Sequence, residues 1–166
     1  MQKRNLLLLP FLLFLFSCIS TGPRFQSLAK PLPEHTKVYI YRQSSMFQQG
    51  SFVGVRVDGN LVATIKNGTY CALDLDEKAH EVEFSIDGNP ICITCKGKGP
   101  TILKTTIASN PIGSTVFYKL KLYAPSNKFI SSPTPVFLYS VAANLEPTEE
   151  NQAIQDLQDL SLAIEP

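Results

Sequence analysis

The sequence predicts an all-β protein, an antiparallel β-sandwich of about seven to nine strands, and three observations indicate it. Short runs rich in β-branched and aromatic residues alternate between apolar and polar positions at period two. Gly, Asn and Asp separate these runs at regular spacing. Twelve Pro and nine Gly, scattered without a period, disfavour long helices and collagen-like repeats. The 166 residues therefore fit one folded domain with appendages.

The composition narrows the class of protein further. Hydrophobic residues make up 44% of the chain and charged residues 17%, which is enough apolar content for a packed core. The formal net charge of +1 argues against a generally basic nucleic-acid-binding protein. We therefore expect a folded protein that does not bind nucleic acid.

The N-terminus has the features of a signal peptide, predicted over residues 1–17. Lys3 and Arg4 precede an apolar stretch, residues 6–16, that only Pro10 interrupts. At ~1.5 Å per residue such a helix covers about half of a ~30 Å hydrocarbon core, so it is too short for a permanent membrane span.

The residues that follow indicate the type of signal peptide. The run Leu15-Phe16-Ser17-Cys18 resembles the bacterial lipobox. The resemblance implies a diacylglycerol thioether and further acyl chains such as palmitate on Cys18, which becomes the new N-terminus and anchors the chain in a membrane. Ordinary secretion, with Cys18 as a leftover thiol, is the alternative. Ile19 stands where an Asp would suggest inner-membrane retention, so the outer membrane of a diderm cell is the expected location.

Residues 18–35 are predicted to be a lipidated, flexible tether. They have no apolar period and contain Pro23, Pro31 and Pro33. At ~3 Å per residue of extended chain, such a segment would hold the folded part tens of ångströms from the lipid.

The predicted β-sandwich domain occupies residues 36–145. Turns are expected at Asp58-Gly59, Asn67-Gly68 and Asp87-Gly88, because these residues tolerate the positive φ of tight turns. The expected strands are 38–42, 52–57, 61–66, 70–75, 80–86, 91–95, 101–108, 115–123 and 136–141.

Several landmarks in this domain carry a resemblance to a known family. They are Val38-Tyr39-Ile40-Tyr41-Arg42, Val57-Asp58-Gly59, Lys66-Asn67-Gly68-Thr69-Tyr70, His80-Glu81-Val82 and Phe117-Tyr118-Lys119-Leu120. Over about residues 36–123 the chain resembles a domain-of-unknown-function family of bacterial lipoproteins, which is similar to the PEGA-type β domains of envelope proteins. The resemblance implies a small β-sandwich displayed in the cell envelope and supplies no active site.

Three cysteines remain beside the lipidation candidate: Cys71, Cys92 and Cys95. An exported chain can oxidise them, so we expect a disulfide from Cys71 to Cys92 or Cys95 with one spare thiol. Three reduced buried thiols are an alternative. A weaker one is a zinc site of Cys71, His80, Cys92 and Cys95, since a single Cys-x-x-Cys without a second pair is a poor zinc signal.

Catalytic patterns are sparse in this sequence. His80 lies on the same strand face as Val82, where a structural histidine is the expected role. Asp74, Asp76 and Glu77 could form a carboxylate cluster, but a solvated turn explains them more simply. The chain has no Gly-x-Ser-x-Gly, Walker-type or His-Glu-x-x-His motif. We therefore expect no enzyme and no cofactor, with a Cys/His metal-binding domain or a hydrolytic periplasmic domain as the alternative.

Charges are segregated along the chain. Between Gly88 and Leu145 there are six Lys and no acid, and after Leu145 there are six acids and no base. Residues 146–166 are predicted to be an acidic tail containing a short helix, with an apolar stripe through Ile154, Leu157, Leu160 or Ser161, and Ile164. We expect the tail to dock on the Lys-bearing half of its own domain; a solvated tail and a partner protein are the alternatives.

These expectations combine into one functional hypothesis. The sequence favours a lipid-anchored binding or structural module of the cell envelope, without catalytic activity, with the outer membrane as its expected location. Its membrane contact would be the lipid anchor on Cys18. Its candidate partners are an envelope protein, peptidoglycan or anionic lipid headgroups.

Overall fold

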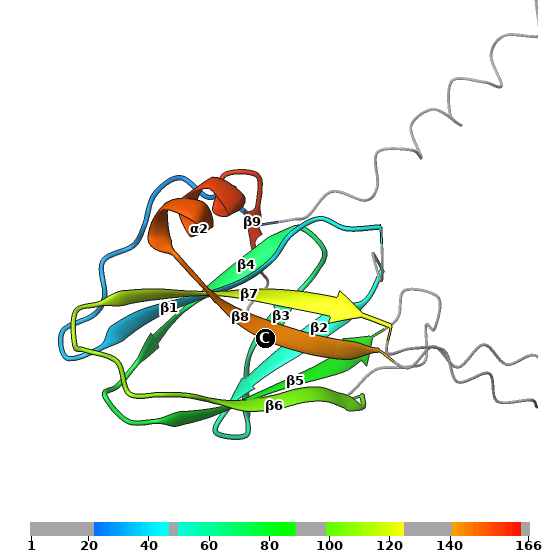
Figure 1. Ribbon diagram of the computed structural model, residues 1–166, viewed down its shortest axis with the longest axis horizontal. Coiled ribbons are helices and arrows are strands. Elements are labelled where there is room, and N and C mark those ends of the chain that lie inside the picture. Colours follow the sequence, from blue (N-terminus) through cyan, green and yellow to red (C-terminus); the bar gives the residue numbers. More distant parts are fainter. Residues whose placement is uncertain (1–21, 47–49, 89–98, 125–140, 164–166) are drawn as a thin grey trace, which may run out of the picture.

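A computed structural model describes residues 22–46, 50–88, 99–124 and 141–163 of the chain. It confirms the predicted β-sandwich, which consists of two packed sheets (Figure 1). Sheet A has the strand order β8-β7-β1-β4-β9, formed by β8 (Ala142–Thr148), β7 (Thr115–Tyr123), β1 (Thr36–Arg42), β4 (Thr69–Leu75) and β9 (Ser161–Leu162). Sheet B has the order β3-β2-β5-β6, formed by β3 (Asn60–Ile65), β2 (Phe52–Val57), β5 (His80–Gly88) and β6 (Thr101–Ile107).

The pairing is antiparallel throughout sheet B but mixed in sheet A. There β1 runs parallel to β7, and β4 runs parallel to β9. The chain leaves sheet A after β4, forms β5 and β6 in sheet B, and returns to sheet A at β7. The prediction of antiparallel pairing is therefore correct for most strand pairs, but not for β1 with β7 or for β4 with β9.

The central strand β1 is buried along its entire length, which explains its dense run of β-forming residues. Val38 and Ile40 belong to the core between the two sheets. Tyr39 and Tyr41 alternate with them and belong to a second apolar cluster on the outer face of sheet A. Sheet A therefore has apolar layers on both of its faces.

The main core lies between the sheets and follows the predicted period-two pattern. Its fully buried members include Val53, Val55, Val82 and Phe84, from neighbouring strands of sheet B. The two sheets also come together where β6 lies against β8 and where β3 lies against β4.

Two predicted turns have different roles in the fold. Asp58 and Gly59, at φ of 50° and 84°, close the β2–β3 hairpin as expected. Gly68, at φ of 73°, instead lies where the chain passes from β3 in sheet B to β4 in sheet A. The Asn67-Gly68 turn is therefore a crossover between the sheets and not a hairpin.

The outer face of sheet A is covered by two segments from opposite ends of the sequence. Helix α2 (Glu150–Leu157) and the chain from Gly22 to His35 both lie above this face (Figure 1). Phe25 and Leu28 pack against the same cluster as Ala153 and Leu157. The prediction of a flexible tether over residues 18–35 is thus wrong from Gly22 onward. The segment has no periodic apolar pattern, but its isolated apolar side chains Phe25 and Leu28 pack on the outer face of sheet A.

The C-terminal segment contains a short helix, as predicted, and the helix occupies only part of residues 146–166. Glu146, Pro147 and Thr148 complete β8, and Ser161 and Leu162 form β9. Pro147 is tolerated because β8 is an edge strand of sheet A, where a missing backbone N–H costs little. None of the described helices combines the length and the apolar character that crossing a bilayer requires.

Several predicted features lie outside the described residues. They are the signal peptide 1–17, the lipidation residue Cys18, the expected strand 91–95 with Cys92 and Cys95, most of the expected strand 136–141, and Ile164.

Candidate functional site

The candidate site is a notch in sheet A where β1 and β7 separate. The two strands pair from Lys37 with Thr115 to Tyr41 with Lys119. Beyond that point β7 continues beside β8 as far as Tyr123, whereas the chain after β1 stays near the β3–β4 crossover, where Ser45 N donates to Asn67 Oδ1 at 3.0 Å. The separation opens a cavity of about 450 Å³, which we call the β1/β7 notch.

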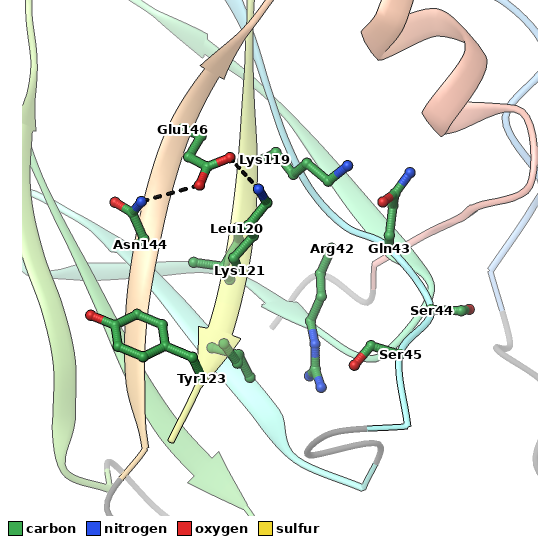
Figure 2. Close-up of a pocket in the computed structure, with 11 residues that line it drawn as sticks. Arg42, Gln43, Ser44, Ser45, Lys119, Leu120, Lys121, Tyr123, Asn144 and Glu146 are labelled. Carbon is green, nitrogen blue, oxygen red and sulfur yellow. Dashed lines mark hydrogen bonds and ion pairs between the residues drawn. The ribbon is translucent and has the colours of Figure 1, made fainter. Parts of the chain in front are cut away.

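The notch has both polar and apolar surface, and it carries more positive than negative charge. Its lining comprises Arg42, Gln43, Ser44, Ser45, Lys119, Leu120, Lys121, Leu122, Tyr123, Asn144 and Glu146 (Figure 2). Three of these side chains are cations and one is a carboxylate. Glu146 accepts from Lys121 at 2.6 Å and from Asn144 at 3.2 Å, so the acid is held on the β8 side of the notch.

Arg42 supplies the most buried charge of the notch. Its guanidinium donates to the Ser51 carbonyl at 3.0 Å, which links the end of β1 to the residue before β2. Figure 2 shows the side chain extending into the space between the end of β7 and Ser45. Burial lowers the pKa of Arg42 to about 10, so the group still carries its charge at neutral pH.

Lys119 connects the notch to helix α2. Its ammonium lies 3.0 Å from Asp156, which also accepts from the Tyr41 hydroxyl at 2.9 Å and from Gln152 at 2.9 Å. Burial disfavours the charged form of Asp156, but these three hydrogen bonds outweigh it and hold the pKa of the carboxyl below its usual range. One of the predicted contacts between the acidic tail and the Lys-bearing half is therefore present, and it fixes one wall of the notch.

A second polar cluster surrounds His80 at the start of β5. Its Nδ1 lies 2.7 Å from Asp58 Oδ2, and its Nε2 lies 3.0 Å from Asp76 Oδ1. The hydrogen bond with Asp58 raises the pKa of His80 more than burial lowers it, and Asp76 adds to the increase. Both ring nitrogens therefore act as donors in the protonated ring, and the cluster links the β2–β3 hairpin to the chain entering β5.

This cluster gives a prediction for stability against pH. Because the pKa of His80 is higher in the folded chain, its contribution is complete below the unfolded pKa of about 6.5 and is lost as pH rises through the folded value. His80→Gln is therefore expected to destabilise the protein most below pH ~6 and progressively less at higher pH. Urea unfolding of both proteins across this range measures the difference. A difference that stays constant with pH would contradict the prediction, and Asp58→Asn should flatten the dependence in the same way.

Cys71 differs from its predicted role. Its thiol is free and buried in the core between the sheets, together with Ile40 and Leu75. Burial raises the pKa of the Cys71 thiol to about 12, so it remains protonated and unreactive. The expected disulfide from Cys71 to Cys92 or Cys95 is therefore absent from this cysteine, because its side chain points into the apolar interior. Cys92 and Cys95 lie outside the described residues.

The predicted acidic and metal-binding sets are separated by the fold. Asp74 pairs with the buried Lys37 at 2.5 Å and accepts from Leu32 N at 3.1 Å, whereas Asp76 belongs to the His80 cluster. Within the described ranges, no three His, Cys, Asp or Glu side chains come together to hold a metal ion. Of the zinc alternative, Cys71 lies in the core and His80 is bonded to Asp58 and Asp76, whereas Cys92 and Cys95 lie outside the described residues.

Sequence reasoning missed the buried charges of this fold. Arg56 donates to Asp87 at 2.7 Å and to Ser85 at 2.5 Å, and Asp87 is also within 2.6 Å of the Ser85 hydroxyl. A Cβ on Gly54 would lie 2.0 Å from Asp87, so this glycine provides the space for the pair. Alternation could have indicated that Arg56 lies on the face opposite Val55, but not that Arg56 is buried.

Comparisons with known proteins give no relative: no family model, no curated protein and no solved structure matches the chain.

Proposed function

We propose that this protein is a lipid-anchored, non-catalytic binding or structural module of the bacterial cell envelope, held in the outer membrane through Cys18. The lipobox-like run at residues 15–18 supports the anchor. The resemblance of residues 36–123 to PEGA-type domains of bacterial lipoproteins belongs to the same proposal. The ligand is an anionic group of an envelope component, with the carboxylates of peptidoglycan as the first candidate.

The observation that supports binding is the β1/β7 notch. It combines a cavity of about 450 Å³ with three cations and two serine hydroxyls, and small-ligand sites commonly have such concave shapes with a few polar groups. A carboxylate or phosphate entering the notch would meet charge-assisted donors from Arg42 and Lys121. The arrangement therefore favours an anion over a cation.

The clusters of the fold support binding more than catalysis. A general base needs a free nitrogen or oxygen near a nucleophile. Both ring nitrogens of His80 are occupied by carboxylates, and Cys71 lies in the core with a raised pKa. Neither group is placed to activate a substrate.

Charge reversal in the notch tests this proposal. Lys121→Glu is expected to weaken co-sedimentation of the full-length protein with purified peptidoglycan sacculi at least about tenfold, since a charged hydrogen bond contributes roughly 1.5 kcal/mol or more. Lys104→Glu is the matched control. Lys104 is also a surface lysine paired with a glutamate, Glu81, at 2.8 Å, and its side chain is 57% exposed against 51% for Lys121.

The control lies on β6 of sheet B and is not one of the residues that line the notch, so its effect should be small. Equal loss of binding in the two variants would mean that sacculi attract the overall charge and not the notch. Absence of binding by the unmodified protein, with retention by vesicles of anionic lipid instead, would replace peptidoglycan by lipid headgroups as the ligand.

A further inference from the structure

The first described residues of the chain are attached to the edge of sheet A. Leu162 N donates to the Pro23 carbonyl at 2.8 Å, and Phe25 N donates to the Leu160 carbonyl at 3.0 Å. Arg24 forms an antiparallel bridge with Ser161 of β9. The N-terminal segment therefore covers the open edge of β9 and is part of the folded domain from Gly22 onward.

Side-chain packing strengthens this attachment. The Phe25 ring meets Tyr70 edge-on with centroids 5.7 Å apart, and meets Tyr39 at 6.4 Å. Ala29 N donates to the Tyr39 hydroxyl at 2.7 Å. A Cβ on Gly22 would lie 2.0 Å from the Leu162 carbonyl oxygen, so the two backbones approach as closely as a glycine allows. The segment is thus fixed by hydrogen bonds, aromatic contacts and close backbone packing.

The fixed position of Gly22 limits how far the domain can stand from a lipid on Cys18. Only residues 19–21 lie between these two positions. Four consecutive steps of extended chain span at most about 14 Å, which is less than half the thickness of a typical bilayer core. The tens of ångströms expected for a tether of eighteen residues are therefore out of reach.

We propose that the β9 edge of the sandwich, consisting of Gly22, Pro23, Arg24, Gln26 and β9, lies directly against the headgroups of the membrane that holds the lipid anchor. This inference rests on the proposed function for the anchor itself, and it adds which surface of the domain meets the bilayer. The partner is the phosphate-bearing headgroup layer of that membrane.

The chemistry of this edge fits such a partner. Pro23, Arg24 and Gln26 are exposed, so a cation stands two residues after Gly22. A basic side chain near an anionic lipid surface strengthens association about fivefold. The short linker contributes more, because it keeps the edge at millimolar effective concentration beside the surface.

The opposite side of the molecule provides an internal reference. Strand β6 is the last strand of sheet B and lies against β8, whereas β9 is at the other edge of sheet A. Thr106 on β6 is exposed. A probe at Thr106 should therefore remain distant from the lipid while a probe at Gln26 is close to it.

The experiment uses the absence of tryptophan from the sequence. The lipidated full-length variants Gln26→Trp and Thr106→Trp are reconstituted separately in phosphatidylcholine and phosphatidylglycerol vesicles that carry a nitroxide quencher on some headgroups. We expect strong quenching for Gln26→Trp and at least fivefold weaker quenching for Thr106→Trp. The difference should persist in ~1 M salt, where the Debye length is about 3 Å, because the linker is covalent.

A spacer separates the linker from other causes of proximity. Twenty Gly and Ser residues inserted between Ser20 and Thr21 give a chain with a root-mean-square length of about 27 Å, and quenching of Gln26→Trp should fall to near the Thr106→Trp value. Equal quenching at the two positions, weak quenching at Gln26, or quenching that the spacer leaves unchanged would each overturn the inference.

Failure of the anchor gives a different result from failure of this inference. If Cys18 carries no lipid, every variant stays in solution when the vesicles are floated, and mass spectrometry shows no added acyl chains. If the variants float with the vesicles and carry lipid, but the Gln26→Trp signal is not quenched, the anchor stands and only the placement of the β9 edge is wrong.

Discussion

A chain that ends after Thr148 is expected to lose at least about 5 kcal/mol of unfolding free energy, which is a large part of the 5–15 kcal/mol typical of a domain. This truncation keeps β8 but removes α2 and β9. It uncovers the part of the outer face of sheet A that α2 and β9 cover, in the cluster that contains Tyr39, Tyr41, Tyr70 and Phe117. Each buried leucine that is lost accounts for about 1.5–3 kcal/mol.

Point substitutions divide this effect into smaller steps. Leu157 is fully buried, so Leu157→Ala should cost about 2–5 kcal/mol through lost contacts and the cavity left behind. Asn151→Ala is the matched control on the same helix, because Asn151 is exposed and its effect should stay within about 0.5 kcal/mol.

Urea unfolding of the three variants and binding of a hydrophobic dye measure these changes. The truncated chain should also bind the dye, since its aromatic face is uncovered. Unchanged stability after truncation, without dye binding, would mean that α2 and β9 do not cover sheet A in solution.

Replacing Cys18 by serine is expected to release the protein from the membrane fraction completely. Serine cannot form the thioether, and two or more acyl chains are needed for stable anchoring. Fractionation of cells that express Cys18→Ser, with labelled fatty acid, measures both the location and the modification. Ser17→Ala serves as a control, because a small residue before the cysteine retains the lipobox-like pattern. If the Cys18→Ser variant stays in the membrane and carries label, the anchor lies elsewhere.

The parts of the fold that sequence predicted are those specified by local patterns. Alternation along His80–Gly88 and the Asp58-Gly59 turn each depend on neighbours within a few residues, and both are present in the structure. β9 and the segment beginning at Gly22 could not be predicted in this way. Their pairing joins Arg24 to Ser161, which are far apart in the sequence, and neither segment has an alternating pattern of its own.

The candidate site was unpredictable for a related reason. Arg42 stands at the end of an obvious strand, and Lys119 and Lys121 alternate along another. The notch between them exists because the parallel pairing of β1 with β7 stops at Tyr41 and Lys119. The position at which pairing between two distant strands ends cannot be read from the sequence of either strand alone. His80 has two carboxylate partners, Asp58 and Asp76, and these come from separate turns that the strand pattern does not connect.

In the export that the proposed function implies, the bridge between Arg24 and Ser161 also sets an order of events. A chain that emerges from a translocation channel N-terminus first presents Gly22 to His35 long before β9 is available. The sheet edge cannot close until nearly all of the chain has crossed, and closing such a distant contact is slow. Until then the residues around Cys18 belong to a stretch of chain that is not yet bound to the folded domain. Under the proposed function, lipid attachment at Cys18 therefore has a period of open access that ends when β9 has crossed the membrane.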